Sequence, residues 1–236
     1  MYRELVVYLI RNYSRSYRYV PPLFAFLMFV VFLYSYKPNY VMSSFAVTAS
    51  ALFVVSSWIC YTFIRSEHPV QEQLSMIHMR SVPRYYVGML VSVLAVVFAF
   101  AVFALAYPIV FNKLVRMPTP AEIVVGLLAH MGMACLGSVI ACFFNQRFVP
   151  RPFFAIGGLL GVAILSFSQG ALAQQLGEQF QWIEWALPPA FQLLDLMMNY
   201  GSYSSGSTIG SIVLPFLYAA VLAAIFVRLM KRRLAG

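Results

Sequence analysis

The sequence predicts an all-α integral membrane protein with six transmembrane helices in a single domain that covers residues 1–236, and three observations lead to this fold class. Hydrophobic residues make up 62% of the chain and charged residues only 10%, whereas soluble domains typically contain about 45–50% apolar and about 25% charged residues. The apolar residues form continuous runs that approach or exceed the ~20 residues needed to cross a bilayer core. These runs do not alternate apolar with polar residues, which excludes the strands of a membrane β-barrel.

Six apolar runs are interpreted as the spans. The first run is the shortest, and no cleaved leader peptide is expected before it. The six are Val20–Tyr36, Val41–Ile64, Val87–Phe111, Ile123–Phe144, Phe153–Ala173 and Ile209–Met230.

The basic residues lie between or beside these runs, and their distribution predicts the orientation of the chain. The formal net charge is +9, but nucleic-acid binding is not expected, because nucleic-acid binders gather their basic residues on a folded soluble surface. One side of the predicted membrane carries only Lys37, Lys113 and Arg116. The other basic residues fall on the opposite side: Arg3, Arg11, Arg15, Arg18, Arg65, Arg80, Arg84, Arg147, Arg151, Arg228, Lys231, Arg232 and Arg233. The positive-inside rule therefore places both termini in the cytoplasm of a multi-pass cell-membrane protein.

Residues 1–19 are predicted to form an amphipathic helix in the membrane interface. Leu5, Tyr8, Leu9 and Tyr13 share one helical stripe, and the arginines fall largely on other faces. Such a helix buries its apolar side while the arginines reach the lipid phosphates. The alternative is a frayed basic tail that only orients the first span.

The loop 65–86 is the longest predicted cytoplasmic connection, and it contains a short helix signal. A proline suits a first helical position, Glu72 favours the N-terminal turn and Arg80 favours the end. Between them lies a short apolar stripe, which contains Val70, Leu74, Met76 and Ile77. The helix is expected either to present this stripe to a partner or to rest on the bilayer.

Residues 174–208 are expected on the outer side, where Trp182 and Trp185 are typical of a membrane interface. The apolar residues around Asp195 are too few to cross a bilayer, so short re-entrant helices and a surface amphipathic helix are the two interpretations. In the fifth span, Gly157 and Gly161 form a small-xxx-small pair that would allow close packing of helices, within the subunit or in a dimer.

Motifs for catalysis, metal binding and nucleotide binding are missing from the sequence. There is no His-Glu-x-x-His helix, no paired intramembrane aspartates, no serine nucleophile motif and no phosphate-binding loop. His130 is the one candidate base in a span, and it is interpreted as a hydrogen-bonded packing residue. The odd number of cysteines inside apolar runs favours packing roles over disulfides or metal ligation; they are Cys60, Cys135 and Cys142.

This arrangement resembles the ABC-2 class of permeases, the membrane subunits of many ATP-driven exporters. The shared features are an amphipathic N-terminal helix, six spans, a cytoplasmic helix after span two and re-entrant-looking pieces before span six. Two stretches of the sequence are also similar to stretches found in the family. They are EHPVQEQLSMIHMRSVPRY at 67–85 and LPPAFQLLDL at 187–196. One departure is Pro69-Val70-Gln71 where the family usually has Gly-Thr.

The resemblance implies a permease that exports a hydrophobic or amphipathic substrate, such as a peptide, lipid or drug, across a bacterial cell membrane. Its partners would be a separate cytoplasmic ATP-binding subunit and a second permease copy, identical or related, and this chain would bind no cofactor itself. We expect the ATPase contact to involve Glu72, Leu74, Ile77, His78 and Arg80. The alternatives are a six-span intramembrane enzyme or accessory protein, and a carrier or channel that works without ATP.

Overall fold

The computed structural model describes residues 2–170 and 187–235, and this part of the chain is almost entirely helical and contains no β-sheet. The sequence predicted this helical architecture, and the described residues confirm it. The helices are α1 (Tyr2–Arg15), α2 (Val20–Leu33), α3 (Val41–Ile64), α4 (Pro69–His78), α5 (Val82–Val110), α6 (Pro120–Phe143), α7 (Pro152–Phe167), α10 (Ala190–Met198), the 3-10 turn η2 (Tyr200–Ser202) and α11 (Ser205–Ala235).

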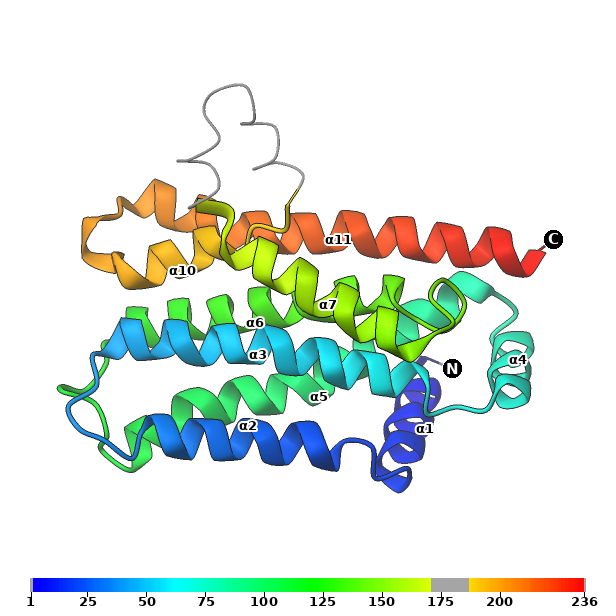
Figure 1. The fold of residues 1–236 in the computed structure, drawn as a ribbon, viewed down its shortest axis with the longest axis horizontal. Helices are drawn as coiled ribbons and strands as arrows, with labels where there is room; N and C mark the ends of the chain where they lie inside the picture. The colour runs from blue at the N-terminus through cyan, green and yellow to red at the C-terminus, as the bar shows by residue number, and fades with distance from the viewer. Residues whose placement is uncertain (1, 171–186, 236) are drawn as a thin grey trace.

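The long helices lie along one axis of an elongated bundle (Figure 1). Helices α2, α3, α5, α6 and α11 run along this axis, and α7 packs over α3 and α6. Helix α4 lies at one end of the bundle, which we call the α4 end, together with α1 and the C-terminal part of α11. Helix α10 lies at the opposite end. Both α1 and the C-terminal part of α11 therefore lie at one end of the bundle, and the cytoplasmic orientation of this end stays a prediction.

Among the described residues, four helices are long and apolar enough to cross a membrane, namely α3, α5, α6 and α11. A fifth crossing is reached only if α1 and α2 count as one span, and these two helices meet at a bend of 82°. Six full-length spans are therefore not established, although the several apolar helices indicate a membrane-embedded protein.

The two remaining predicted spans are shorter in the structure than in the sequence analysis. Helix α2 has 14 residues and α7 has 16, lengths of about 21 and 24 Å at 1.5 Å per residue, below the ~30 Å of a bilayer core. Helix α2 ends at Leu33, before the polar stretch that leads to Lys37. The end predicted for the fifth span, residues 171–173, lies outside the described residues.

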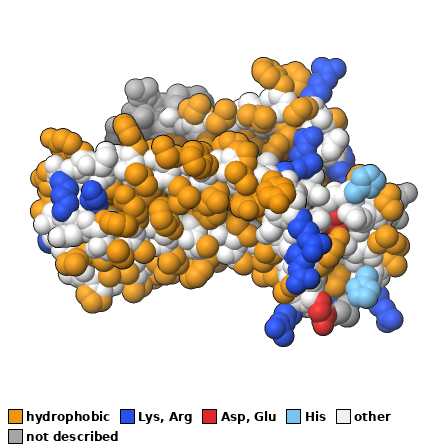
Figure 2. Space-filling view, turned by 90° about the horizontal axis from the view of Figure 1, so that it is seen from below, with side chains coloured by type: hydrophobic (Ala, Val, Ile, Leu, Met, Phe, Trp, Pro, Cys, Tyr) orange, Lys and Arg blue, Asp and Glu red, His pale blue; other side chains and the backbone are white. Residues whose placement is uncertain are grey.

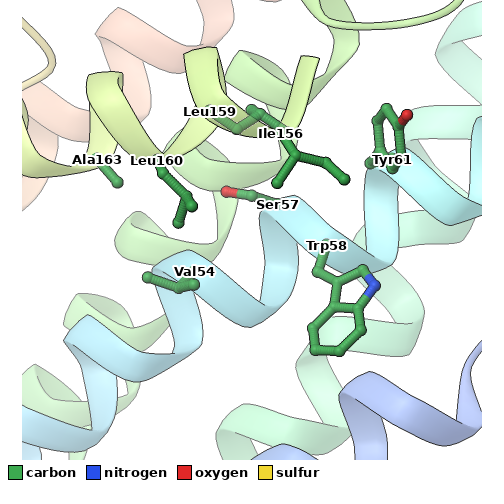
Figure 3. A pocket seen from close by; sticks show the side chains of 8 residues that line it. All are labelled: Val54, Ser57, Trp58, Tyr61, Ile156, Leu159, Leu160 and Ala163. Carbon is green, nitrogen blue, oxygen red and sulfur yellow. The ribbon is translucent and has the colours of Figure 1, made fainter. Parts of the chain in front are cut away.

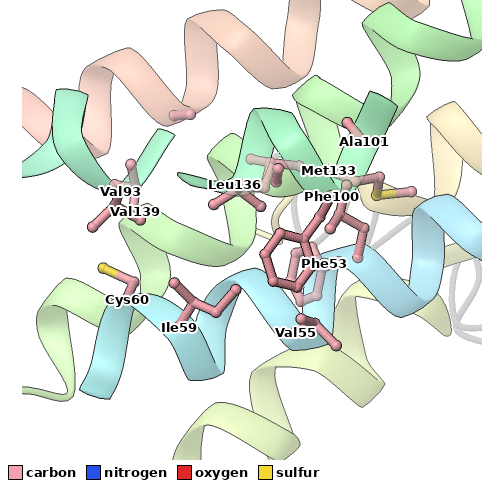
Figure 4. Close-up of a cluster of buried hydrophobic side chains, with 14 of the residues drawn as sticks. Phe53, Val55, Ile59, Cys60, Val93, Phe100, Ala101, Met133, Leu136 and Val139 are labelled. Atoms are coloured by element: carbon pink, nitrogen blue, oxygen red, sulfur yellow. The ribbon is translucent and has the colours of Figure 1, made fainter. Parts of the chain in front are cut away.

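The core lies where α3, α5 and α6 meet, and α3 and α6 form the most extensive contact in the bundle. Figure 4 shows apolar side chains from all three helices interdigitating there. Gly137 allows this approach: a Cβ at this position would lie only 2.2 Å from the Phe53 carbonyl oxygen and 2.5 Å from Ser56 Oγ. Glycine is required here because the backbone of α3 occupies the space of any side chain.

The surface distribution of charge agrees with a membrane-embedded bundle. Figure 2 shows a wide apolar band between two ends that carry the basic side chains. Exposed apolar residues on the sides of helices are ordinary for a protein solvated by lipid, and they include Phe24, Met28, Phe32, Val91, Phe98, Leu217 and Val221.

The described part of segment 174–208 contains the short helix α10, which packs on the bundle, followed by η2 and the first residues of α11. Helix α10 has nine residues, about 14 Å, which is too short to cross a bilayer. It buries Ala190, Leu193, Leu196 and Met197 and contacts α3, α6, α7 and α11. Trp182 and Trp185 lie outside the described residues, so the path of the chain before α10 stays a prediction.

Candidate functional site

The α4 end holds the largest concentration of polar contacts between different elements, and it is the candidate functional site. Helix α4 begins at Pro69, a position where the backbone N–H that proline lacks would have no partner within the helix. Nδ1 of His68 accepts a hydrogen bond from the Val70 N–H at 3.4 Å. It ends two residues before Arg80, whose φ of 52° lies in the left-handed region that commonly terminates helices. The sequence prediction of a short helix after Ile64 is therefore confirmed.

Glu67, just before α4, is buried and binds three hydroxyl groups. Its carboxylate accepts hydrogen bonds from Tyr8 at 3.0 Å, from Ser75 at 2.9 Å and from Tyr85 at 2.5 Å. These donors come from α1, α4 and α5, and Tyr8 of α1 lies 59 positions from Glu67 in the sequence. A buried carboxylate is stable only when it is hydrogen-bonded or paired, and the three hydroxyls meet this requirement. Glu67 therefore joins three helices at one point.

Glu72, on α4 itself, forms the second connection. Its carboxylate accepts a hydrogen bond from Tyr86 at 2.7 Å and pairs with Nη2 of Arg147 at 2.6 Å. Arg147 lies in the loop between α6 and α7. Burial lowers the pKa of Arg147, but the hydrogen bond and the charge of Glu72 oppose this effect. The pKa of Arg147 is therefore raised above its usual value. The ion pair thus attaches α4 to the loop between α6 and α7.

Further contacts continue from Arg147 to the end of the chain. Arg233 of α11 donates a hydrogen bond to the carbonyl oxygen of Arg147, and its guanidinium lies 4.8 Å from the centre of the Phe148 ring. We call the groups joined by Glu67 and Glu72 the α4 network; they are Tyr8, Glu67, Glu72, Ser75, Tyr85, Tyr86 and Arg147. This network reaches α1, α4, α5 and the α6–α7 loop, and Arg233 extends it to α11.

The apolar residues of α4 divide between two faces. Met76 and the following Met79 are buried against the bundle, whereas Leu74 is 61% exposed and Ile77 is 72% exposed. Val70 is also exposed. Covering a face of this kind with a partner is favourable, since apolar area is removed from water. Helix α4 therefore combines a firmly attached inner face with an uncovered apolar outer face.

The residues predicted for the ATPase contact do not all lie on this outer face. Leu74 and Ile77 do, and His78 and Arg80 are exposed beside them. Glu72 instead points into the bundle, where Tyr86 and Arg147 engage it. Its role in the structure is to position α4, which differs from the rim contact expected from the sequence.

The amphipathic helix predicted for residues 1–19 is present as α1, but its apolar stripe has a different environment from the one expected. Leu5, Leu9 and Tyr13 are buried and pack within the protein, chiefly against α5. Gly88 makes room for this contact, because a Cβ there would lie 2.5 Å from a methyl group of Leu5. The apolar stripe of α1 therefore covers protein rather than lipid.

Gly157 and Gly161 lie on an open side of α7. A Cβ at either position would meet no described atom within 4 Å. Packing inside the subunit therefore does not explain this pair among the described residues, and a contact with a second copy stays a prediction.

An apolar pocket of about 310 Å³ separates α3 from α7 (Figure 3). Leu159, Leu160 and Ala163 of α7 face Val54 and Ser57 of α3 across it, as the close-up shows. The remaining lining residues are Trp58, Tyr61 and Ile156. The sequence could not reveal this pocket, because its residues come from helices about a hundred positions apart.

His130 is placed as the sequence suggested, in a packed and hydrogen-bonded position. It is fully buried, with Nε2 at 2.9 Å from the Thr48 hydroxyl and Nδ1 at 2.7 Å from the Gly126 carbonyl oxygen. The cysteines are free, and Cys60 and Cys142 are in contact at 3.7 Å between their sulfur atoms. Within residues 2–170 and 187–235, no group of three or more His, Cys, Asp or Glu could hold a metal ion.

Glu67 and Arg147 are the site residues that sequence reasoning missed. Their partners lie 8 to 75 positions away, and no local pattern identifies such contacts. Comparison with protein-family models, curated proteins and solved structures gives no match to this chain. The site is therefore interpreted from its geometry alone.

Proposed function

We propose that this chain is the permease subunit of an ABC exporter, driven by a separate ATP-binding subunit that docks on α4. The observation that carries the proposal is the division of α4 into two faces. Its inner side is attached to the bundle through Glu67 and Glu72, and its outer side presents Leu74 and Ile77. A helix that transmits motion from a soluble motor to membrane helices needs both properties.

The α4 network supports this role because it connects α4 to elements that would have to move. A displacement of α4 acts on α5 through Tyr85 and Tyr86, and on the α6–α7 loop through Arg147. The ATPase supplies energy only if its contact with α4 changes with its nucleotide state. Burial of Leu74 and Ile77 in a cleft of that subunit would contribute about 3–6 kcal/mol before ordering costs.

The proposal also implies an orientation of the chain in the membrane, a second permease copy and a class of substrate. Docking of a cytoplasmic ATPase requires the α4 end to face the cytoplasm, which agrees with the excess of basic residues at this end. A second permease copy would complete the pathway, with the open side of α7 at Gly157 and Gly161 as the candidate contact. The substrate class is hydrophobic or amphipathic, because the spans hold few charged groups that could line a polar path.

The experiment is co-expression of the tagged chain with the ATPase encoded by the neighbouring gene, followed by purification in detergent. The double variant Leu74→Asp/Ile77→Asp should reach the membrane but lose the ATPase and the transport activity, because charged groups oppose burial in an apolar cleft. The matched control is Val115→Asp/Met117→Asp, which places the same charges on exposed apolar residues at the opposite end.

The two variants separate the possible outcomes. Loss of the ATPase only in the α4 variant supports docking at α4 and its cytoplasmic orientation. Retention of the ATPase and of transport in the α4 variant would show that α4 merely rests on lipid. Activity of the isolated wild-type chain without any ATPase would instead favour an intramembrane enzyme or an ATP-independent carrier.

A further inference from the structure

A second pocket lies near the apolar pocket between α3 and α7, and one hydrogen bond joins a lining residue of each. This polar pocket lies at the α4 end and has a volume of about 630 Å³. Arg18, Arg65 and Arg147 line it together with Asn145 and His68. Tyr61 links the two pockets: it lines the apolar one, and its hydroxyl accepts a hydrogen bond from Nη1 of Arg65 in the polar one.

The side-chain amide of Asn145 contains a donor that lacks an acceptor, which indicates a ligand at this position. The residue is 2% exposed, and its Oδ1 accepts the backbone N–H groups of Arg147 and Phe148. Its Nδ2 is buried and has no hydrogen-bond partner among the described residues. A buried donor without an acceptor is costly, so native structures usually provide one. An acceptor in this pocket would satisfy the amide.

The charges of the pocket favour an anion as that acceptor. Glu67 and Glu72 also line it, but three hydroxyls engage the first, and Tyr86 and Arg147 engage the second. The guanidinium of Arg65 uses one of its five N–H donors on Tyr61 and donates no further hydrogen bond to a described residue, while the Arg65 carbonyl oxygen accepts one from Arg18. Guanidinium groups that retain free donors are well suited to bind phosphate oxygens.

We infer that the two pockets together bind one anionic phospholipid from the leaflet at the α4 end. The phosphate and acidic headgroup lie against Arg65 and the Asn145 amide, and an acyl chain enters the apolar pocket between α3 and α7. The depth agrees, since Val54 to Tyr61 form the part of α3 nearest the α4 end. A free phosphate or nucleotide would leave the apolar pocket unused, so the nearby chain-sized pocket selects a lipid.

The lipid has a structural consequence that does not depend on the proposed export function. It bridges the C-terminal end of α3, the α6–α7 loop and α7, whose direct contacts with α3 and α6 are sparse. The inference therefore applies equally to an exporter, an enzyme or a carrier built on this fold.

The test uses the full chain in vesicles and the fluorescence of Trp58, which lines the apolar pocket. The chain has three tryptophans, so Trp182→Phe/Trp185→Phe leaves Trp58 as the single emitter. Quenching is compared for phosphatidylglycerol and phosphatidylcholine that carry bromine on the acyl chains, each at the same mole fraction in unlabelled phosphatidylcholine. A bound anionic lipid should give about a five-fold preference for brominated phosphatidylglycerol, the ratio that one basic residue near an anionic surface provides.

Two variants and one control assign the preference to this site. Asn145→Asp keeps the oxygen that accepts the Arg147 and Phe148 N–H groups but places a negative charge where the amide was, and Arg65→Gln removes the cation. Both should reduce the preference to near unity. Arg84→Gln removes an exposed basic residue that does not line the pocket and should leave the preference unchanged.

The contrary results are equally clear. Equal quenching by both lipids in the single-tryptophan protein would overturn the inference. An equal decrease in Arg65→Gln and Arg84→Gln would also overturn it, because the preference would then reflect general surface charge. Export assays play no part in this test, so its failure leaves the proposed function to be judged separately.

Discussion

The contact between α3 and α6 and the attachment of α4 hold helices together in opposite ways. At Gly137 the two backbones are so close that not even a methyl group would fit. At the α4 end the helices are joined by the long side chains of Glu67 and Glu72, which bind hydroxyl and guanidinium groups. Close-packed surfaces resist small displacements, whereas hydrogen bonds between flexible side chains tolerate them. The comparison indicates a rigid centre and an adjustable end.

The largest effect is expected at the centre. Gly137→Ala places a methyl group 2.2 Å from the Phe53 carbonyl oxygen, and overpacking of this kind typically costs about 1–3 kcal/mol. We expect a clearly lower Tm of the purified protein in detergent. Gly210→Ala in α11 is the matched control, because its Cβ meets no described atom, and it should keep or slightly raise the Tm. Equal Tm values for both variants would contradict a tightly packed centre.

An intermediate effect is expected in the α4 network. Glu67→Gln keeps the size of the side chain but removes the charge that three hydroxyls bind, a change worth about 1–2 kcal/mol. Amide hydrogen exchange measured by mass spectrometry should accelerate in α4 and remain unchanged in α3 and α6. Glu122→Gln, which removes a carboxylate that pairs with Arg116 away from α4, should not affect exchange in α4. Faster exchange throughout the bundle would mean that the two regions are not separable.

The smallest effect is expected on the outer face of α4. Leu74→Ser/Ile77→Ser changes only exposed side chains, and surface substitutions usually alter stability by less than ~0.5 kcal/mol. The Tm of the isolated chain should therefore stay close to that of the wild type. A large decrease would show that these residues stabilise the chain itself, which would weaken their assignment to a partner contact.

Sequence reasoning located the helices that have a strong local signal. The third helix was predicted at Val41–Ile64, the bounds that α3 has, because a long apolar run ends at Arg65. The run Phe153–Ala173 was instead read as one full span, whereas helix α7 ends at Phe167, a bend at Ser168 separates it from helical residues 169–170, and residues 171–173 lie outside the described part. A count of apolar residues gives the length of a run, and it does not show where a helix ends within that run.

The candidate site was recovered only in part, for a related reason. The exposure of Leu74 and Ile77 follows from their spacing on one short helix, which the sequence contains. The inward direction of Glu72 depends on Arg147, 75 positions away, and the role of Glu67 depends on Tyr8 and Tyr85. These contacts form only when distant helices pack together, so local sequence patterns do not predict them.

The order of residues in the α4 network also determines when α4 is completed during synthesis. Tyr8 and Tyr85 are made early, so Glu67 meets its partners once the first part of the chain has left the ribosome. Glu72 gains Arg147 only after α6 has been made, and Arg233 reaches the Arg147 carbonyl oxygen only after α11 has been made. A truncated chain that lacks α11 would therefore present α4 without the last of these contacts. Quality-control proteases that recognise loosely held helices would have a means to distinguish a chain that lacks α11 from one that contains it.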